Sequence, residues 1–139
     1  MPCLPALVTP FRHVALIILT LWAAAAQAIS YGPVLSDADG NKSAIETSGM
    51  TRKGYIVYAW QLVNFEQPKD NAVLSARSQI EFDCRFKQSR IMWVILHSDR
   101  DGAGDVIRSA AISAPVWEKT VAGSVAADQL EFACRSIMR

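Results

Sequence analysis

Acidic residues and glycines gather in two short stretches that resemble calcium-binding loops. Residues 99–105 read Asp-Arg-Asp-Gly-Ala-Gly-Asp, with Gly104 in the sixth position, where an EF-hand loop has glycine. The twelfth position, which needs a glutamate, holds Ala110. Residues 37–41 fail in the same way, with Ser48 in the twelfth position. Asp-Gly sequences favour turns, so we predict two solvated turns and neither a metal site nor a cofactor.

A second candidate for chemistry is His97, which follows an apolar run and could act as a general base. A hydrolytic triad also needs an activated nucleophile and an orienting acid. The sequence contains no Gly-x-Ser-x-Gly motif that would supply such a nucleophile. We interpret His97 as an ordinary surface residue at a strand end, and we predict no catalytic residues and no enzymatic activity.

Four aromatic residues, Tyr55, Tyr58, Trp60 and Trp93, lie in segments with the composition of strands. Their clustering admits two interpretations. Packing in the core accounts for them most simply, because aromatic side chains dominate core energetics. An aromatic face that binds a ligand is the alternative.

Basic residues gather at the tip of a predicted hairpin, where Arg85, Lys87 and Arg90 are close in sequence. Charges at such a place usually keep an edge solvated and block aggregation. The other interpretation is a binding site for an anionic partner, and these three residues are our candidate binding residues.

The first 28 residues have the features of a secretory signal peptide. Arg12 supplies positive charge, residues 14–26 form an apolar run, and Ala26-Gln27-Ala28 is a small-x-small cleavage site. The run is shorter than the roughly 20 apolar residues of a membrane-spanning helix. We predict a signal peptide over residues 1–28 and an exported domain over residues 29–139 without a stable membrane span. A retained anchor is the alternative.

Removal of the signal peptide changes the composition of the chain. The whole sequence has 139 residues, a formal net charge of +1 and three cysteines. Without Arg12 and Cys3, 13 basic residues balance 13 acidic ones, and Cys84 and Cys134 remain. A neutral chain of this length excludes a multidomain enzyme and argues against nucleic acid as a partner. Two cysteines in an exported domain predict a disulfide between them.

The elements that must position these residues are mostly strands. Over residues 78–86, the apolar residues Ile80, Phe82, Cys84 and Phe86 alternate with charged ones, which predicts a strand with one buried and one wet face. Residues 91–96 are apolar on both faces, which predicts a central strand paired with the first in a hairpin.

Other segments have weaker strand signals. Residues 55–63 are rich in aromatic and β-branched residues and predict a strand that ends before Pro68. Residues 106–113 predict a further strand, and residues 31–35 and 44–47 predict two short ones.

The C-terminal part of the chain has a helical pattern. Ser124 is a candidate N-cap, and Ala126, Leu130, Ala133 and Cys134 form one apolar stripe over residues 125–134. A helix face that carries Cys134 can meet a sheet face that carries Cys84. We therefore predict an α+β fold, in which a small antiparallel sheet of about five or six strands packs against one C-terminal helix tethered by the disulfide.

Several of these motifs occur in a characteristic order. Residues 55–60 lead to Asn-Phe-Glu-Gln-Pro at 64–68, followed by Glu-Phe-Asp-Cys at 81–84, Arg90 on the return strand, and a tail over 115–125 that runs into the helix. Over residues 39–135 this pattern resembles the surface-adhesin protein E family of exported bacterial proteins. The resemblance implies the same disulfide-tethered α+β fold.

The resemblance also implies a function. It suggests a non-enzymatic protein of the periplasm or outer cell surface that recognises a protein partner, and the family name implies a host extracellular-matrix protein. The alternative is a periplasmic structural or envelope-associated module without a host ligand. A homodimer through an exposed sheet edge is left open.

Overall fold

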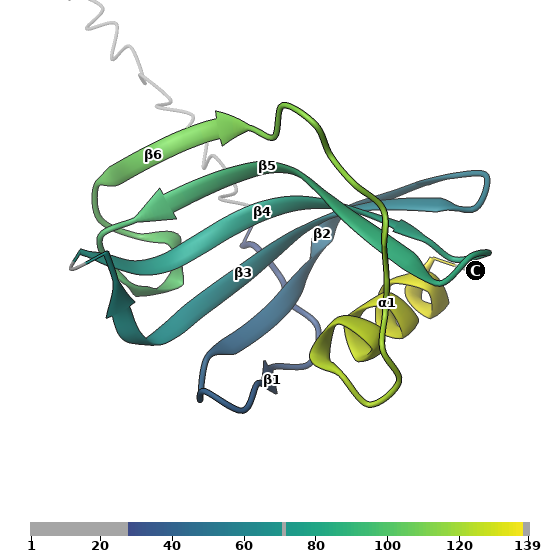
Figure 1. Cartoon of the computed structure of the whole chain (residues 1–139), viewed down its shortest axis with the longest axis horizontal. Helices are drawn as coiled ribbons and strands as arrows, with labels where there is room; N and C mark the ends of the chain where they lie inside the picture. Colours follow the sequence, from purple (N-terminus) through teal and green to yellow (C-terminus); the bar gives the residue numbers. More distant parts are fainter. Residues whose placement is uncertain (1–27, 71, 138–139) are drawn as a thin grey trace, which may run out of the picture.

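The computed structural model describes residues 28–70 and 72–137 (Figure 1). The predicted signal peptide lies outside the described residues, except for Ala28. The elements are β1 Leu35–Ser36, β2 Lys42–Lys53, β3 Ile56–Lys69, β4 Val73–Asp83, β5 Gln88–His97, the 3-10 turn η1 Arg100–Gly102, β6 Val106–Ala111, β7 Glu118–Lys119 and α1 Val125–Ser136.

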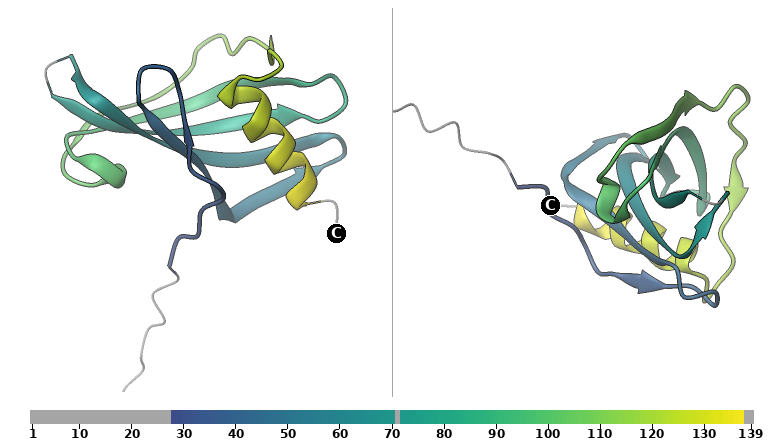
Figure 2. Two further views of the ribbon diagram at one scale, coloured as in Figure 1. Left: turned by 90° about the horizontal axis from the view of Figure 1, so that it is seen from below. Right: turned by 90° about the vertical axis from the view of Figure 1, so that its left-hand side faces the viewer.

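The strands form one antiparallel sheet in the order β1-β2-β3-β4-β5-β6, and β7 pairs with the first residues of β5. Each strand from β1 to β6 therefore lies beside its neighbour in sequence. The sheet is strongly twisted, and α1 lies along one of its faces (Figure 2). The predicted α+β fold, with an antiparallel sheet and one C-terminal helix, is confirmed.

Strands β2, β3, β4 and β5 are all longer than the sequence predicts, β2 and β3 by the most. β2 has 12 residues, whereas the sequence predicts a strand only at 44–47. The rest of β2 escapes prediction because a register shift between Glu46 and Thr51 interrupts the alternation of buried and exposed residues. β3 continues to Lys69 and includes Pro68. Its pairing with β4 is irregular between Asn64 and Lys69, so Pro68 sits where no ladder hydrogen bond is required.

The faces of β4 follow the predicted alternation only in part. Ile80 and Phe82 are buried as predicted, but Phe86 is 60% exposed. The strand ends at Asp83, whose carboxylate accepts hydrogen bonds from the backbone N–H groups of Arg85 and Phe86 and so forms the turn. Asp83 is therefore buried rather than wet, and the same is true of Glu81.

Helix α1 begins at the predicted N-cap, where the Ser124 hydroxyl accepts a hydrogen bond from the Ala127 N–H at 3.2 Å. Leu130, Ala133 and Cys134 are buried against the sheet as predicted. Ala126 is exposed, however, and Gln129 is buried in its place.

Polar partners on the sheet allow Gln129 to occupy this buried position. Its amide oxygen accepts a hydrogen bond from the Gln61 amide at 2.6 Å, and its own amide donates to the Ser43 hydroxyl at 3.0 Å. A buried helix face predicted from apolar residues alone does not include a glutamine.

The core lies between α1 and strands β2, β3 and β4. Ile45, Val57, Phe82 and Leu130 are the largest of its side chains that are almost fully buried. The predicted disulfide between Cys84 and Cys134 closes the far end of this core, with a Cα–Cα distance of 5.7 Å. The bond therefore joins the end of β4 to the last turn of α1.

Replacing both Cys84 and Cys134 by serine should lower the free energy of unfolding by about 2–4 kcal/mol, because the bond closes a loop between residues that are 50 apart in sequence. Urea denaturation of the oxidised protein measures the change. Wild-type protein unfolded in reductant is the matched control and should match the double variant. Equal stability of the oxidised wild type and the double variant would contradict the prediction.

Candidate functional site

The face of the sheet opposite α1 collects aromatic and charged side chains. The register aligns Glu46, Trp60, Gln79 and Trp93 directly across β2 to β5. Strand residues alternate between faces, so these side chains point away from the core residues that precede or follow them. We call this surface the aromatic face and define it as Glu46, Tyr58, Trp60, Arg77, Gln79, Glu81, Arg90, Trp93 and Trp117.

All three tryptophans of the described chain belong to this face. Trp93 is 38% exposed, and Trp60 and Trp117 are half-buried. None of them joins the core cluster under α1. Core packing is thus the wrong interpretation for Tyr58, Trp60 and Trp93.

One side of the aromatic face is built from Glu46, Arg77 and Trp60. The Arg77 guanidinium donates to the Glu46 carboxylate at 2.8 Å and lies 5.1 Å from the centre of the Trp60 ring. Glu46 is only 9% exposed, so water screens this ion pair weakly. The pair holds the guanidinium against the indole, where a cation–π interaction adds to the attraction.

The other side repeats this arrangement with Glu81, Arg90 and Trp117. Arg90 donates to the Glu81 carboxylate at 2.7 Å and lies 4.3 Å from the centre of the Trp117 ring. Glu81 is likewise 9% exposed. Two arginines are therefore fixed beside tryptophans with their orientations already set, which lowers the entropy cost of using them in binding.

Trp93 lies between the two arginine–tryptophan stacks. Its indole N–H donates to the Ser109 hydroxyl of β6 at 2.9 Å, which fixes the ring orientation while part of the ring stays in contact with solvent. A fixed, partly exposed indole is suited to contact with a partner surface.

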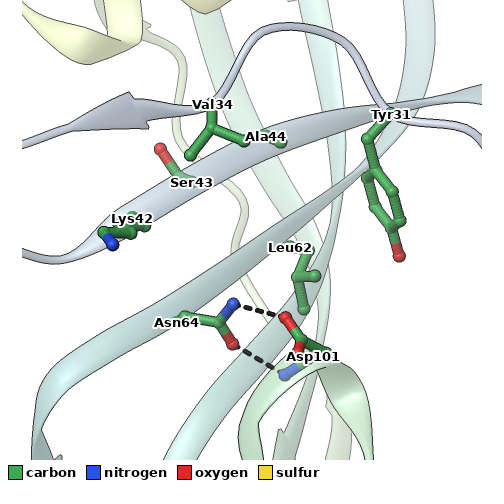
Figure 3. Close-up of a pocket in the computed structure, with 8 residues that line it drawn as sticks. All are labelled: Tyr31, Val34, Lys42, Ser43, Ala44, Leu62, Asn64 and Asp101. Atoms are coloured by element: carbon green, nitrogen blue, oxygen red, sulfur yellow. Dashed lines mark hydrogen bonds between the residues drawn. The ribbon is translucent and has the colours of Figure 1, made fainter.

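A pocket of about 330 Å³ opens at the edge of the same face (Figure 3). Its lining residues are Tyr31, Val34, Lys42, Ser43, Ala44, Leu62, Asn64 and Asp101. Ala44 and Leu62 are buried and supply apolar surface, whereas Lys42, Asn64 and Asp101 are polar. The pocket can therefore take an apolar group of modest size and offer hydrogen bonds around it.

The loop between β5 and β6 forms one wall of this pocket. The Asn64 side chain donates to the Asp101 carboxylate and accepts from the Asp101 backbone N–H, both at 2.7 Å. Gly102 has a φ of +68°, and an added Cβ there would lie 3.0 Å from the Arg77 side chain. The residues at 99–105 thus form a structural wall, and those at 37–41 form a turn in which Asp37 accepts three hydrogen bonds.

Across the pocket, Tyr31 comes from the segment that precedes β1 (Figure 3). Burial, and then the negative charge of Glu46, raise the pKa of the Tyr31 phenol above its ordinary value of 10.0. Tyr31 therefore presents a neutral hydroxyl to the pocket at physiological pH.

His97 is buried under this loop, with 7% of its surface exposed, so its interpretation as a surface residue is wrong. Neither ring nitrogen has a hydrogen-bond partner among the described residues. Burial, and then the positive charge of Arg77, lower the pKa of His97 below its ordinary value of 6.5.

The three basic residues singled out by the sequence are not brought to one surface. Arg85 and Lys87 are exposed in the turn between β4 and β5, whereas the side chain of Arg90 lies on the aromatic face. Their role in binding stays a prediction. The sequence did not predict the roles of Arg77 and Glu46. Opposite charges on two separate strands are only a weak sign that the two side chains form an ion pair.

Two further observations bear on function. In residues 28–70 and 72–137, no three His, Cys, Asp or Glu side chains gather closely enough to hold a metal ion. Within the same part of the chain, α1 has 12 residues and no helix has the length and apolar character to cross a bilayer.

Comparison with models of protein families places the chain in a known family. The family model described as "Surface-adhesin protein E" matches residues 31–135, which include every named strand of the sheet and all but the last residue of α1. No curated protein matches the chain.

The lowered pKa of His97 predicts a pH dependence of stability. Below pH 6.5, His97 is protonated more fully in the unfolded chain than in the folded chain, because folding lowers its pKa. The free energy of unfolding should therefore rise with pH up to about 6.5 and then level off. Replacing His97 by phenylalanine should reduce this slope. Urea denaturation of both proteins at several pH values gives the two slopes. Identical slopes would contradict the prediction.

Proposed function

The chain belongs to the surface-adhesin protein E family, and from this membership we propose that it is an exported, non-enzymatic binding module that holds a protein partner on the aromatic face. The observation that carries the proposal is the pair of Glu–Arg–Trp stacks on either side of Trp93. They belong to a surface that is not part of the core beneath α1.

The composition of the aromatic face supports a protein partner. Tryptophan, tyrosine and arginine are the residue types that carry most of the binding energy in protein interfaces. Here Trp60, Trp93, Tyr58 and the two arginines lie on adjacent strands of one sheet, and Trp117, from the segment before β7, stacks on Arg90. The carboxylates of Glu46 and Glu81 already neutralise the arginines, so a partner need not bring matching acids into a desolvated contact.

The pocket at the edge of the face supplies a second element of recognition. Its apolar surface at Ala44 and Leu62 can accept one apolar side chain of the partner, while Asn64, Lys42 and the Tyr31 hydroxyl offer polar contacts at its rim. An apolar anchor in a pocket surrounded by polar contacts is the usual anatomy of a specific interface.

We place this activity outside the cytoplasm, in the periplasm or on the outer surface. The sequence of residues 1–28 and the disulfide between Cys84 and Cys134 support export, because disulfides persist in oxidising compartments. The family name supports a host extracellular-matrix protein as the class of partner.

A periplasmic structural module without a host ligand is the second candidate, and another surface favours it. Beside α1, β5 and the segment after β6 expose Ile91, Ile112 and Val116 by 43%, 38% and 69%. Among the described residues, β6 pairs only with β5, so its outer edge is unpaired. An unpaired edge next to apolar surface could assemble a homodimer or join an envelope complex.

Binding to immobilised extracellular-matrix proteins tests the proposal. The chain from Ile29, with its disulfide formed, should bind at least one of them with micromolar affinity or better. Trp60→Ala and Trp93→Ala should each weaken that binding by about 30-fold, the loss expected for a residue at the centre of an interface. Surface plasmon resonance measures the affinities.

The matched control is Val121→Ala, because Val121 is 72% exposed and lies outside the aromatic face. This variant should bind as the wild type does. Near-ultraviolet circular dichroism shows whether the tryptophan variants keep the fold. If the folded wild type binds no matrix protein at micromolar concentration, the adhesin proposal fails and the structural module takes its place.

Location at the cell surface can be tested on intact cells. A surface adhesin should be cleaved when whole cells are treated with protease, whereas a periplasmic marker protein in the same cells should survive. Immunoblotting of the treated cells measures the loss. Full protection of the chain, with cleavage only after the outer membrane is opened, would place it in the periplasm and contradict adhesion.

A further inference from the structure

A second surface lies at one end of the sheet, where the β2–β3 and β4–β5 turns meet (Figure 1). The Cys84 N–H donates to the Tyr55 carbonyl oxygen at 2.9 Å, so the two turns are adjacent. Tyr55 is 57% exposed and Phe86 is 60% exposed. The Arg85 guanidinium lies 5.4 Å from the centre of each ring and joins them into one patch.

Exposed basic side chains surround the two rings. Lys53 belongs to the β2–β3 turn region and Lys87 to the β4–β5 turn. The Thr120 N–H donates to the Lys87 carbonyl oxygen at 3.1 Å, which brings β7 and its exposed Lys119 to the same end. We call this surface the basic tip and define it as Lys53, Tyr55, Arg85, Phe86, Lys87 and Lys119.

The carboxylate within the turn, that of Asp83, forms no ion pair with the basic residues of the tip. One Asp83 oxygen accepts from the backbone N–H groups of Arg85 and Phe86, and the other accepts from the Gln88 amide at 3.3 Å. Asp83 is buried and is used to hold the turn. The charges of Arg85 and Lys87 therefore remain available to a partner.

Acidic residues gather at the opposite end of the sheet. In this meander, the turns after β1, β3 and β5 share one end, and the turns after β2 and β4 share the other. The first group carries Asp37, Asp39, Asp70, Asp99, Asp101 and Asp105. Lys42, Lys69 and Arg100 offset part of this acidic charge, and Glu118 offsets part of the charge at the tip. The two ends still differ in sign, so an anionic surface would attract the basic tip more than the far end.

We propose that the basic tip docks the protein on an anionic lipid surface, with Tyr55 and Phe86 entering the headgroup region. Exposed aromatic rings at the ends of turns, surrounded by lysine and arginine, match the chemistry of that boundary. Anionic headgroups attract each basic residue near the surface and give about a fivefold gain in binding per charge.

The shape of the tip favours a lipid surface over a soluble ligand. Both rings project from turns, so a small anion or a peptide strand would touch one side of each ring and leave the rest in water. A bilayer interface surrounds both rings at once. The disulfide at Cys84 ties the β4–β5 turn to α1, so the tip presents its rings with little further loss of conformational entropy.

This docking goes beyond the proposed binding of a protein partner and is independent of it. The residues of the basic tip are distinct from those of the aromatic face. Lipid docking and binding of a protein partner can therefore be tested separately. Docking through the tip would leave Trp60 and Trp93, which lie inside β3 and β5, free to contact a protein partner.

Vesicle co-sedimentation tests the proposal with the oxidised chain from Ile29, which contains every strand, the helix and the disulfide. Vesicles with about one third phosphatidylglycerol should bind the protein at low salt, and vesicles of phosphatidylcholine alone should not. Arg85→Gln with Lys87→Gln should weaken binding roughly 25-fold. Tyr55→Ser with Phe86→Ser should also weaken vesicle binding, although it leaves the net charge unchanged. This loss should persist at high salt, because it does not depend on charge.

The matched controls change the same kinds of residue elsewhere. Lys42→Gln with Lys69→Gln removes two charges from the acidic end, and Val106→Ser with Ile107→Ser removes exposed apolar groups of β6, away from the tip. Both should bind as the wild type does. No binding to anionic vesicles, equal binding to both vesicle types, or an equal loss in the controls would overturn the proposal. So would binding to soluble heparin alone, which would assign the tip to a polyanionic chain.

Discussion

The contact between α1 and strands β2 to β4 is the interaction on which the rest of the structure depends. A helix of 12 residues is marginal by itself in water, so its stability comes from packing Leu130 and Ala133 on the sheet. The Cys84–Cys134 disulfide fixes that contact at one end, and the Gln129 hydrogen bonds hold it along the helix. Because the main core cluster lies between α1 and this face of the sheet, the opposite face is free of that packing, apart from buried residues beside the β5–β6 loop such as Leu62 and His97.

That freedom explains how a short chain can carry a binding surface on regular strands. The aromatic face needs its own order, which the buried carboxylates of Glu46 and Glu81 provide by holding Arg77 and Arg90 against tryptophans. Sites built on strands are positioned more precisely than sites on mobile loops. The disulfide meanwhile joins the β4–β5 turn to α1, so the same bond that secures the core also orders the basic tip.

Local patterns in the sequence predicted the helix with its Ser124 cap and the hairpin that contains Phe82, because each depends on neighbours in the chain. The disulfide joins residues that are 50 apart, and it was predicted from the presence of two cysteines in an exported domain. Contacts between distant residues account for what was missed. The burial of His97 requires the loop that folds over it, and the exposure of Phe86 follows from the turn at Asp83. The pairing of Glu46 with Arg77 needs the register of three strands, which no single strand pattern contains.

The tryptophan side chains offer the most direct test of the central claim that a partner binds on the aromatic face. The chain from Ile29 contains three tryptophans, all on that face, so its nitrogen–proton correlation spectrum should show three indole signals. When a matrix protein that binds is titrated in, the indole signals of Trp60 and Trp93 should shift or broaden while the backbone signals of α1 stay in place. Changes confined to α1 or to the β6 edge, with unchanged indole signals, would contradict it.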